Sequence, residues 1–245
     1  MTGTAGPART DGASRTDGAS PTKSRGRKWS RAAAGLAGFA ILASARDLVE
    51  QRDVWSIEQR VKSQSLALSR GEVPSASAVR AQPGLPPRGQ VYGALLIANE
   101  ARGEADPAVR ARMLEQANAA LARARAARPF WGEAAAVHAY VLSLRDGPNA
   151  ATTQAALVDS YDAAPFLRDA GAWRAQAALA DPDALPPRTR TRAIDEAVWV
   201  AKLSSRSRPL MFAAARRTSL YPEFAARWLE ARAGDADIAA KTGAP

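Results

Sequence analysis

The side chains best suited to chemistry are few and widely separated in this 245-residue sequence. His138 is the only histidine, and it lies within an apolar helical pattern that places no nucleophile or orienting group beside it, as a general base would need. Asp195 and Glu196 are adjacent, so on a helix they project about 100° apart and make a poor acid–base pair. We therefore interpret His138 as a packed helix residue and expect no catalytic residue.

Two further groups of charged residues have the spacing of binding sites. Asp181 and Asp183 resemble the paired acids that hold a metal on sugar nucleotides in glycosyltransferases, but a proline separates them in a loop, which favours a capped turn. Arg188, Arg190 and Arg192 are spaced by two at the start of a helix. They therefore fan around its axis, which is more typical of a solvated helix end than of a polysaccharide site.

The sequence lacks the motifs on which most enzyme sites are built. It contains no GxxxxGK[ST], GxGxxG, GxSxG or HExxH, so phosphate loops, dinucleotide turns, serine nucleophiles and paired zinc ligands have no scaffold. It also contains no cysteine, which excludes disulfides and thiolate sites. We expect a chain that is not an enzyme and that uses neither a metal nor a small-molecule cofactor.

The charge is unevenly distributed. Half of the formal charge of +10 lies in residues 1–31, so the remainder is only mildly basic and gives little reason to expect nucleic-acid binding. Residues 1–28 are rich in Gly, Ser, Thr and charged side chains and predict a disordered basic leader, since they cannot bury enough apolar surface to offset the entropy of ordering.

Residues 29–46 predict a transmembrane anchor. The uncharged stretch 32–45 would rise only about 21 Å as a helix against a hydrocarbon core of about 30 Å, but arginines that snorkel at both ends bring it near the lower limit. The anchor side chains are Trp29, Leu36, Phe39, Ile41 and Leu42. A cleaved signal peptide ending at the Ala-Ser-Ala of residues 43–45 and a soluble buried helix are the alternatives. Basic residues concentrate before the segment, which predicts a cytoplasmic N-terminus.

Residues 47–70 predict a juxtamembrane helix. Val54, Ile57, Val61 and Leu68 follow a heptad-like spacing, which fits either a short coiled coil or a stripe that packs on the neighbouring domain. Residues 71–89 contain four prolines and three glycines and predict a linker.

Residues 90–233 predict a helical domain, so the fold class is all-α: a membrane-anchor helix followed by a short α-solenoid. Asp106 caps and Pro107 opens one helix, while Gly147 and Pro148 stop another. Caps, prolines and apolar spacing predict helices over 90–103, 107–127, 130–145, 152–163, 167–180, 187–204, 210–218 and 223–233. Residues 234–245 predict a flexible tail.

A repeat of 36 residues links these helices. Leu121, Ala127, Pro129 and Phe130 align with Leu157, Ala163, Pro165 and Phe166. Such a period is typical of stacked helix pairs, each of which covers the apolar face that its neighbour leaves open. An irregular helical bundle with coincidental alanines is the alternative.

The repeat resembles the tetratricopeptide repeat. Ala117, Leu121, Ala124 and Pro129 match the second helix of that family's unit. Thr153, Leu157, Ser160 and Pro165 match it more loosely, and Trp173 stands where the family places a first-helix aromatic residue. The glycine and tyrosine of the family's first helix are missing, so the resemblance implies degenerate TPR-like helical hairpins.

The order of segments and residues 185–224 also resemble small accessory proteins of bacterial exopolysaccharide and O-antigen biosynthesis. This resemblance implies a single-pass inner-membrane protein with a periplasmic helical domain. Its function would be that of a non-catalytic scaffold that binds partner proteins of an envelope polysaccharide assembly. A small helical enzyme acting on envelope glycans, and a periplasmic TPR-like protein unrelated to polysaccharide, are the alternatives.

The expected partner-binding surface is the concave side of the repeats, where the first helices of each pair line up. Aromatic and arginine side chains give large contact area at interfaces. The candidate residues are Trp131, His138, Trp173 and Arg174. Burial of both tryptophans in the core is the competing interpretation.

Overall fold

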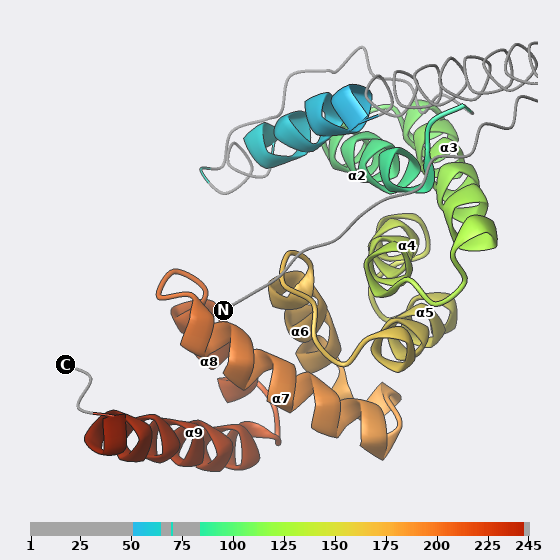
Figure 1. Ribbon diagram of the computed structural model, residues 1–245. Helices are drawn as coiled ribbons and strands as arrows, with labels where there is room; N and C mark the ends of the chain where they lie inside the picture. The colour runs from blue at the N-terminus through green and yellow to red at the C-terminus, as the bar shows by residue number, and fades with distance from the viewer. Residues whose placement is uncertain (1–50, 65–69, 71–83, 243–245) are drawn as a thin grey trace, which may run out of the picture. The chain divides into compact units, whose positions relative to one another are not determined.

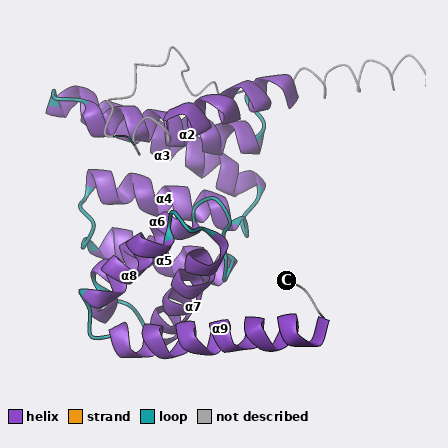
Figure 2. Ribbon diagram, turned by 90° about the vertical axis from the view of Figure 1, so that its left-hand side faces the viewer, coloured by secondary structure: helices purple, strands orange, loops and turns teal. Residues whose placement is uncertain are grey.

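The computed structural model describes residues 51–64, 70 and 84–242 (Figure 1). Within these residues all regular structure is helical, which confirms the predicted all-α class; Figure 2 shows helices and loops and no strand in the described part. The leader, the anchor residues 29–46 and residues 71–83 of the linker lie outside the described residues. Among the described residues, no helix has both the length and the apolar character needed to cross a membrane.

The helices follow the prolines and caps of the sequence closely. A helix over residues 51–64 comes first. It is followed by α2 (Pro87–Gly103), α3 (Pro107–Ala127), α4 (Gly132–Arg145), α5 (Ala151–Ala163), α6 (Gly171–Ala180), the short 3-10 helix η1 (Pro182–Ala184), α7 (Pro187–Leu203), α8 (Arg208–Arg216) and α9 (Tyr221–Thr242).

Local signals fix several of these ends as predicted. The carboxylate of Asp106 accepts hydrogen bonds from the backbone N–H groups of Ala108 (2.8 Å) and Val109 (3.4 Å), so it caps α3 as expected. Gly147 has φ +102°, a conformation that favours glycine, and it ends the turn that follows α4.

Several predicted boundaries differ from the structure, and three of the differences have a clear physical reason. The linker was expected to end at Gly89, but α2 already begins at Pro87, since proline suits a first helical position. Helix α6 begins at Gly171 and not at residue 167, because the Leu167 N–H donates to the Glu196 carboxylate within a turn. Helix α9 continues to Thr242 beyond Gly234, where a tail was expected; Lys202 bonds to Asp235 at 2.7 Å and holds this part of the helix.

Helices that follow one another in the chain pack as pairs. The pairs are α2 with α3, α4 with α5, and α6 with α7. Each pair packs on the next through contacts of α3 with α4 and of α5 with α7, and Figure 2 shows this succession from α2 and α3 to α9. Helix α8 packs on α6 and α7, and α9 packs on α7 and α8.

The helix over residues 51–64 packs on α2. Ile57 and Val61 are buried against Leu96, and Glu58 forms an ion pair with Arg88 at 3.2 Å. Two residues of the predicted heptad-like stripe therefore face a neighbouring helix of the same chain. This packing is the second of the two interpretations that the stripe allowed.

Burial follows the 36-residue period on α3, α5 and α7. The positions equivalent to Ala117 are Thr153 and Thr189, those equivalent to Leu121 are Leu157 and Ala193, and those equivalent to Ala124 are Ser160 and Glu196; all nine are buried. Small side chains at most of these positions let neighbouring helices approach closely. Glu196 is the exception, because a charged residue occupies a position that is Ala or Ser in the two preceding helices.

Candidate functional site

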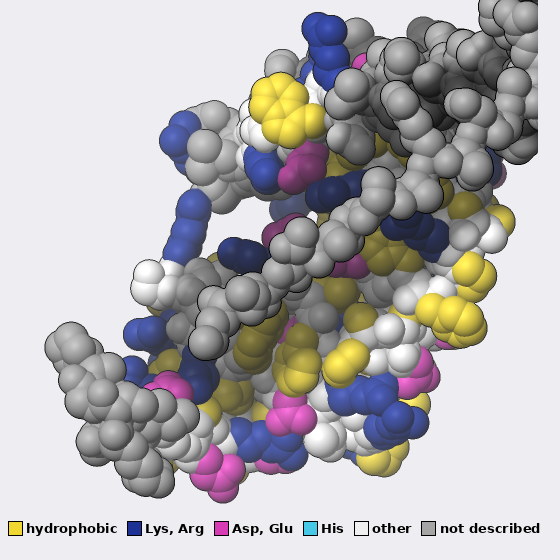
Figure 3. Space-filling model, in the orientation of Figure 1, with side chains coloured by type: hydrophobic (Ala, Val, Ile, Leu, Met, Phe, Trp, Pro, Cys, Tyr) yellow, Lys and Arg dark blue, Asp and Glu magenta, His cyan; other side chains and the backbone are white. Residues whose placement is uncertain are grey.

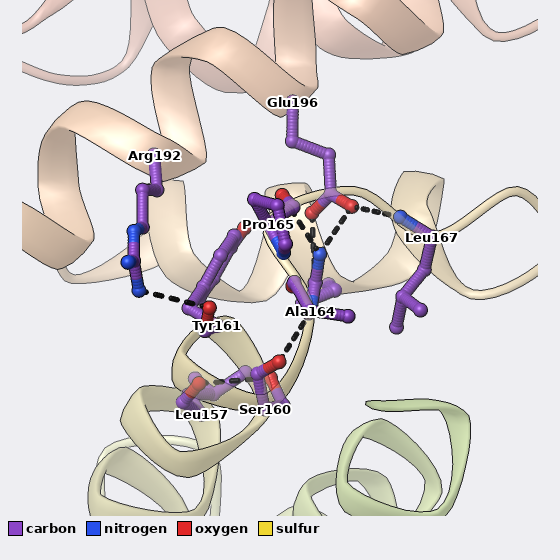
Figure 4. Close-up of polar contacts among 9 residues, drawn as sticks. Leu157, Ser160, Tyr161, Ala164, Pro165, Leu167, Arg192 and Glu196 are labelled. Atoms are coloured by element: carbon purple, nitrogen blue, oxygen red, sulfur yellow. Dashed lines mark hydrogen bonds and ion pairs between the residues drawn. The ribbon is translucent and has the colours of Figure 1, made fainter. Parts of the chain in front are cut away.

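Arg174 and Glu196 form a fully buried ion pair between α6 and α7. Both side chains are 0% exposed. The Arg174 guanidinium donates from Nε to Glu196 Oε2 at 2.8 Å and from Nη2 to Oε1 at 2.5 Å, a bidentate arrangement on the carboxylate of the residue labelled Glu196 in Figure 4. Charged groups are rarely removed from water without such a partner, because desolvation of an isolated charge costs several kcal/mol.

The remaining guanidinium donors bind backbone carbonyls at the end of α5 and in the loop after it. Nη1 donates to the carbonyl oxygens of Ser160 (2.8 Å) and Ala164 (2.9 Å), and Nη2 donates to that of Pro165 (3.2 Å). Arginine has five N–H donors, so all five are satisfied here. The pair therefore fastens the carboxyl end of α5 to both helices of the next pair.

Tyr161 lies against the same ion pair. The Arg174 guanidinium stands over its ring, 4.1 Å from the ring centre. Burial, and next the charge of Glu196, raise the pKa of the Tyr161 phenol well above its ordinary value. Its hydroxyl has no hydrogen-bond partner among the described residues. Tyr161 thus remains a neutral phenol and fills the space beneath the guanidinium.

This burial bears on two interpretations of the sequence: Arg174 as a partner-binding residue, and Glu196 as a carboxylate available for chemistry. Arg174 was expected to offer its guanidinium to a partner protein, but all of its donors are engaged inside the molecule. Glu196 is also committed, because it accepts from Arg174 and from the Leu167 N–H at 2.9 Å. The sequence signal that could have found the pair is the 36-residue period, which assigns Glu196 to a buried position.

Asp195, the neighbour of Glu196, points to a different partner. Its carboxylate accepts from Arg227 of α9, which also binds Glu223 at 2.6 Å. These three side chains and Glu230 line an open hollow of about 610 Å³ between α7 and α9. Among the described residues, no group of His, Cys, Asp or Glu is arranged to hold a metal ion.

The two other charged patterns are also engaged in internal contacts. Asp183 lies in η1 and pairs with Arg190 at 3.5 Å. Arg192 donates to the Tyr161 carbonyl at 2.9 Å and to Asp162 at 2.6 Å, so it joins α7 to α5. The turn is not capped by a side chain, because Asp181 makes no cap hydrogen bond. Arg192 joins two helices, so the expected solvated helix end does not extend to this arginine.

His138 lies on α4 and is half-buried. Its Nδ1 is 2.9 Å from Arg125 Nη1, and Arg125 also reaches Asp159 at 3.5 Å. Because arginine can only donate, Nδ1 accepts and the imidazole is neutral, with its proton on Nε2. Burial, and next the positive charge of Arg125, lower the pKa of His138. Through this contact His138 joins α4 to α3, and its expected role in partner binding stays a prediction.

Both candidate tryptophans are half-buried against the core. Trp131 packs on the cluster formed by α2, α3 and α4, and the guanidinium of Arg128 lies 5.5 Å from its ring centre. Trp173 meets Tyr140 edge to face, with ring centres 5.3 Å apart. The Tyr140 hydroxyl in turn donates to Asn99 at 3.0 Å. Trp173 therefore joins α4 to α6, which fits the competing interpretation of the tryptophans as packing residues.

One exposed aromatic residue was not among the predicted binding residues. Phe130, in the turn between α3 and α4, is 89% exposed. Its equivalent one repeat later, Phe166, packs on Trp199 with ring centres 5.6 Å apart and is 45% exposed. The position equivalent to Trp199 is Ala163, so among the described residues no ring takes the place beside Phe130 that Trp199 takes beside Phe166.

The two turns that carry these phenylalanines lie next to each other. A side chain at Gly132 would come within 2.5 Å of the Ala164 Cβ, which shows how closely the turn before α4 approaches the end of α5. We name Phe130, Trp131 and Phe166 the junction surface. Exposed and half-exposed aromatic residues of this kind are typical of protein interfaces.

Comparison of this chain with family models, with curated proteins and with solved structures returned no match.

Proposed function

We propose that this chain is a non-catalytic scaffold that holds partner proteins of a bacterial envelope polysaccharide assembly. Its helix pairs would form a short α-solenoid of degenerate TPR-like hairpins. Residues 29–46 would anchor it in the inner membrane, with the N-terminus in the cytoplasm and the helical domain in the periplasm.

The observation that carries the proposal is the junction surface. An apolar ring that is 89% exposed gives no packing stability to its own chain, and a partner protein that covers Phe130 would supply the missing contact. The buried period of 36 residues supports the repeat architecture, since stacked pairs leave such turns along one edge.

A scaffold role fits the state of the ionisable groups better than the alternative of a glycan-processing enzyme. Asp183, Asp195 and Glu196 each have an arginine partner within the chain, and the pKa of His138 is lowered by burial and Arg125. Catalytic acids and bases need an accessible proton and a neighbouring reacting group. On the face shown in Figure 3, Lys and Arg side chains are interspersed with Asp and Glu, which supports a role without nucleic acid.

The test is site-specific photo-crosslinking in membranes of the native host. A photoreactive phenylalanine analogue replaces Phe130, and the matched control replaces Arg112, an exposed residue of α3. We expect a protein of the envelope polysaccharide machinery to be cross-linked at position 130 and not at position 112. Recovery of no such protein at position 130 would contradict the proposal.

A pair of alanine variants separates packing from binding. Phe130→Ala should leave the melting temperature unchanged and abolish capture of the partner, because its ring is exposed. Trp173→Ala should lower the stability by about 2 kcal/mol or more, because its ring packs on Tyr140. If Phe130→Ala also destabilises the fold, the ring is a packing residue and the junction surface is not the binding site.

A further inference from the structure

Helix α9 has two opposite faces of different character. Tyr221, Trp228 and Arg232 are spaced by seven and four residues, so they share one face of the helix. Glu223, Arg227 and Glu230 occupy the opposite face and line the hollow against α7. The first face is the one that meets α8, where Arg208, Phe212 and Arg216 are spaced by four and also share a face.

Three arginines of these faces lie over aromatic rings. Arg208 and Arg232 stand 5.4 and 6.0 Å from the ring centre of Trp228. Arg216 stands 5.9 Å from Phe212 and 5.8 Å from Tyr221. Phe212 itself meets Trp228 at 5.4 Å and nearly at right angles. We name this set the arginine–aromatic patch: Arg208, Phe212, Arg216, Tyr221, Trp228 and Arg232.

The positive charge of the patch is not neutralised by carboxylates. Among the described side chains, Asp and Glu form no ion pair with Arg208, Arg216 or Arg232. Of the nearby acids, Glu223 binds Arg227 and Asp235 binds Lys202. Arg216 and Arg232 are exposed, and the three aromatic rings of the patch are only half-buried. The patch therefore combines unpaired charge with accessible apolar area.

An exposed leucine adjoins the patch. Leu229 follows Trp228, lies one turn from Arg232 and is 67% exposed. Leucine beside tryptophan, tyrosine and arginine is the combination found where a protein surface meets a lipid headgroup layer. At such surfaces in general, aromatic rings sit among the headgroups, arginine stems cover apolar area, and leucine side chains reach the acyl boundary.

We propose that the arginine–aromatic patch docks on an anionic phospholipid surface. The chemistry that carries this assignment is unpaired guanidinium charge around half-exposed rings, with Leu229 beside them. The patch holds no amide side chain and no carboxylate. It therefore offers charge and apolar area, but few of the mixed hydrogen-bond donors and acceptors that a surface needs to recognise one particular acidic peptide. Mobile anionic headgroups fit this surface better. The proposal goes beyond the proposed function, and it holds for vesicles whether or not the chain has its own anchor.

The absence of cysteine makes the test specific, because Leu229→Cys gives a single labelling site in the full chain. The labelled chain is mixed with vesicles of phosphatidylcholine alone or of phosphatidylcholine and phosphatidylglycerol in equal amounts. Some of the lipid carries a headgroup quencher. The control label is Ala119→Cys, an exposed position of α3. We expect quenching at position 229 with phosphatidylglycerol, and neither at position 119 nor on the neutral vesicles.

Arginine variants then test the charge. Arg216→Gln and Arg232→Gln should each shift the docking equilibrium on the anionic vesicles, as read by quenching at position 229, about fivefold toward the undocked state, with a smaller effect at high salt. Arg112→Gln, the matched control on α3, should change nothing. Equal quenching on both vesicle types, or anionic binding unchanged in the double variant, would overturn the proposal. The proposal would also be overturned if the double variant lost a co-purifying acidic protein while quenching at position 229 was unaltered, because the patch would then bind that protein and not lipid. Failure of cross-linking at Phe130 would leave these results unaffected, so the two proposals fail separately.

Discussion

At the scale of single residues, the buried ion pair between Arg174 and Glu196 joins α6 to α7, and its guanidinium also binds the end of α5. Five guanidinium donors reach five acceptor contacts, and the carboxylate also receives the Leu167 N–H. A buried charge that loses its partner keeps its desolvation cost and gains nothing in return. The pair is therefore expected to tolerate joint replacement better than single replacement.

We predict that Arg174→Met or Glu196→Leu alone lowers the free energy of unfolding by about 3–5 kcal/mol, because each leaves the other charge buried without a partner. The double variant should recover part of this loss. Urea denaturation followed by helical circular dichroism measures both effects. The control is Arg227→Met, whose pair with Asp195 is partly exposed and should cost about 1 kcal/mol or less. Single variants that cost no more than this control would show that the buried pair does not hold the helices.

The single histidine provides a second residue-scale prediction. Burial, and next Arg125, lower the pKa of His138 in the folded protein below its ordinary value of about 6.5. The unfolded chain then binds a proton more readily than the folded one, so stability rises with pH in the window between the two pKa values. The contribution of His138 is complete above about pH 6.5 and declines as the pH falls through that window.

An NMR titration of the histidine ring reads this pKa directly, since no other histidine signal is present. We expect a midpoint below 6.5 and, for Arg125→Ala, a shift back toward the ordinary value. His138→Gln should remove the corresponding pH dependence of unfolding. A midpoint at or above 6.5 would contradict the assignment of His138 as a buried neutral acceptor.

At the scale of helices, replacement of two glycines by alanine is expected to change the stability in opposite directions. Gly132→Ala would bring a Cβ within 2.5 Å of the Ala164 Cβ, so it should cost about 1–3 kcal/mol despite the higher helix propensity of alanine. Gly234 lies inside α9 with open space around it, so Gly234→Ala should stabilise by up to about 1 kcal/mol.

Thermal unfolding of the two variants checks this pair. Adding Ala164→Gly to Gly132→Ala should restore much of the loss, because it removes the atom that the new Cβ meets. No rescue would place the strain elsewhere in the turn. A Gly234→Ala variant with unchanged or lower stability would indicate that the helix ends before this residue.

Helix ends were predictable where one residue decides them locally. Asp106 and Pro107 act on their own turn, and so does Gly147. The start of α6 was not predictable, because Leu167 continues the apolar period but its N–H is held by Glu196, twenty-nine positions away. The Arg174–Glu196 pair has the same character, since it exists only when α6 lies against α7. The exposure of Phe130 likewise depends on a distant position, because Ala163 has no large side chain that could cover the ring.

At the scale of the whole molecule, the helix pairs pack on one another in succession, and ion pairs join α6 to α7 and α7 to α9. Asp195, Glu196 and Arg174 all form ion pairs within the chain, so a partner would contact other, exposed side chains. The junction surface lies in the turns before α4 and after α5, whereas the arginine–aromatic patch lies on α8 and α9. Partner binding and vesicle binding should therefore respond to different variants. In the proposed anchored state, the side of the membrane on which the helix pairs lie decides which partners they can meet.

The most direct measurement of the central claim is therefore topology. A reporter that is active only outside the cytoplasm is fused to the C-terminus or before Arg25 of the full chain, and the mass of the membrane-bound protein is measured. The account predicts activity at the C-terminus, no activity before Arg25, and a full-length mass in the membrane fraction, because basic residues concentrate ahead of residues 32–45. A soluble periplasmic form beginning at Arg46 would indicate a cleaved signal, and activity of a cytoplasm-only reporter at the C-terminus would contradict the membrane-anchored periplasmic scaffold altogether.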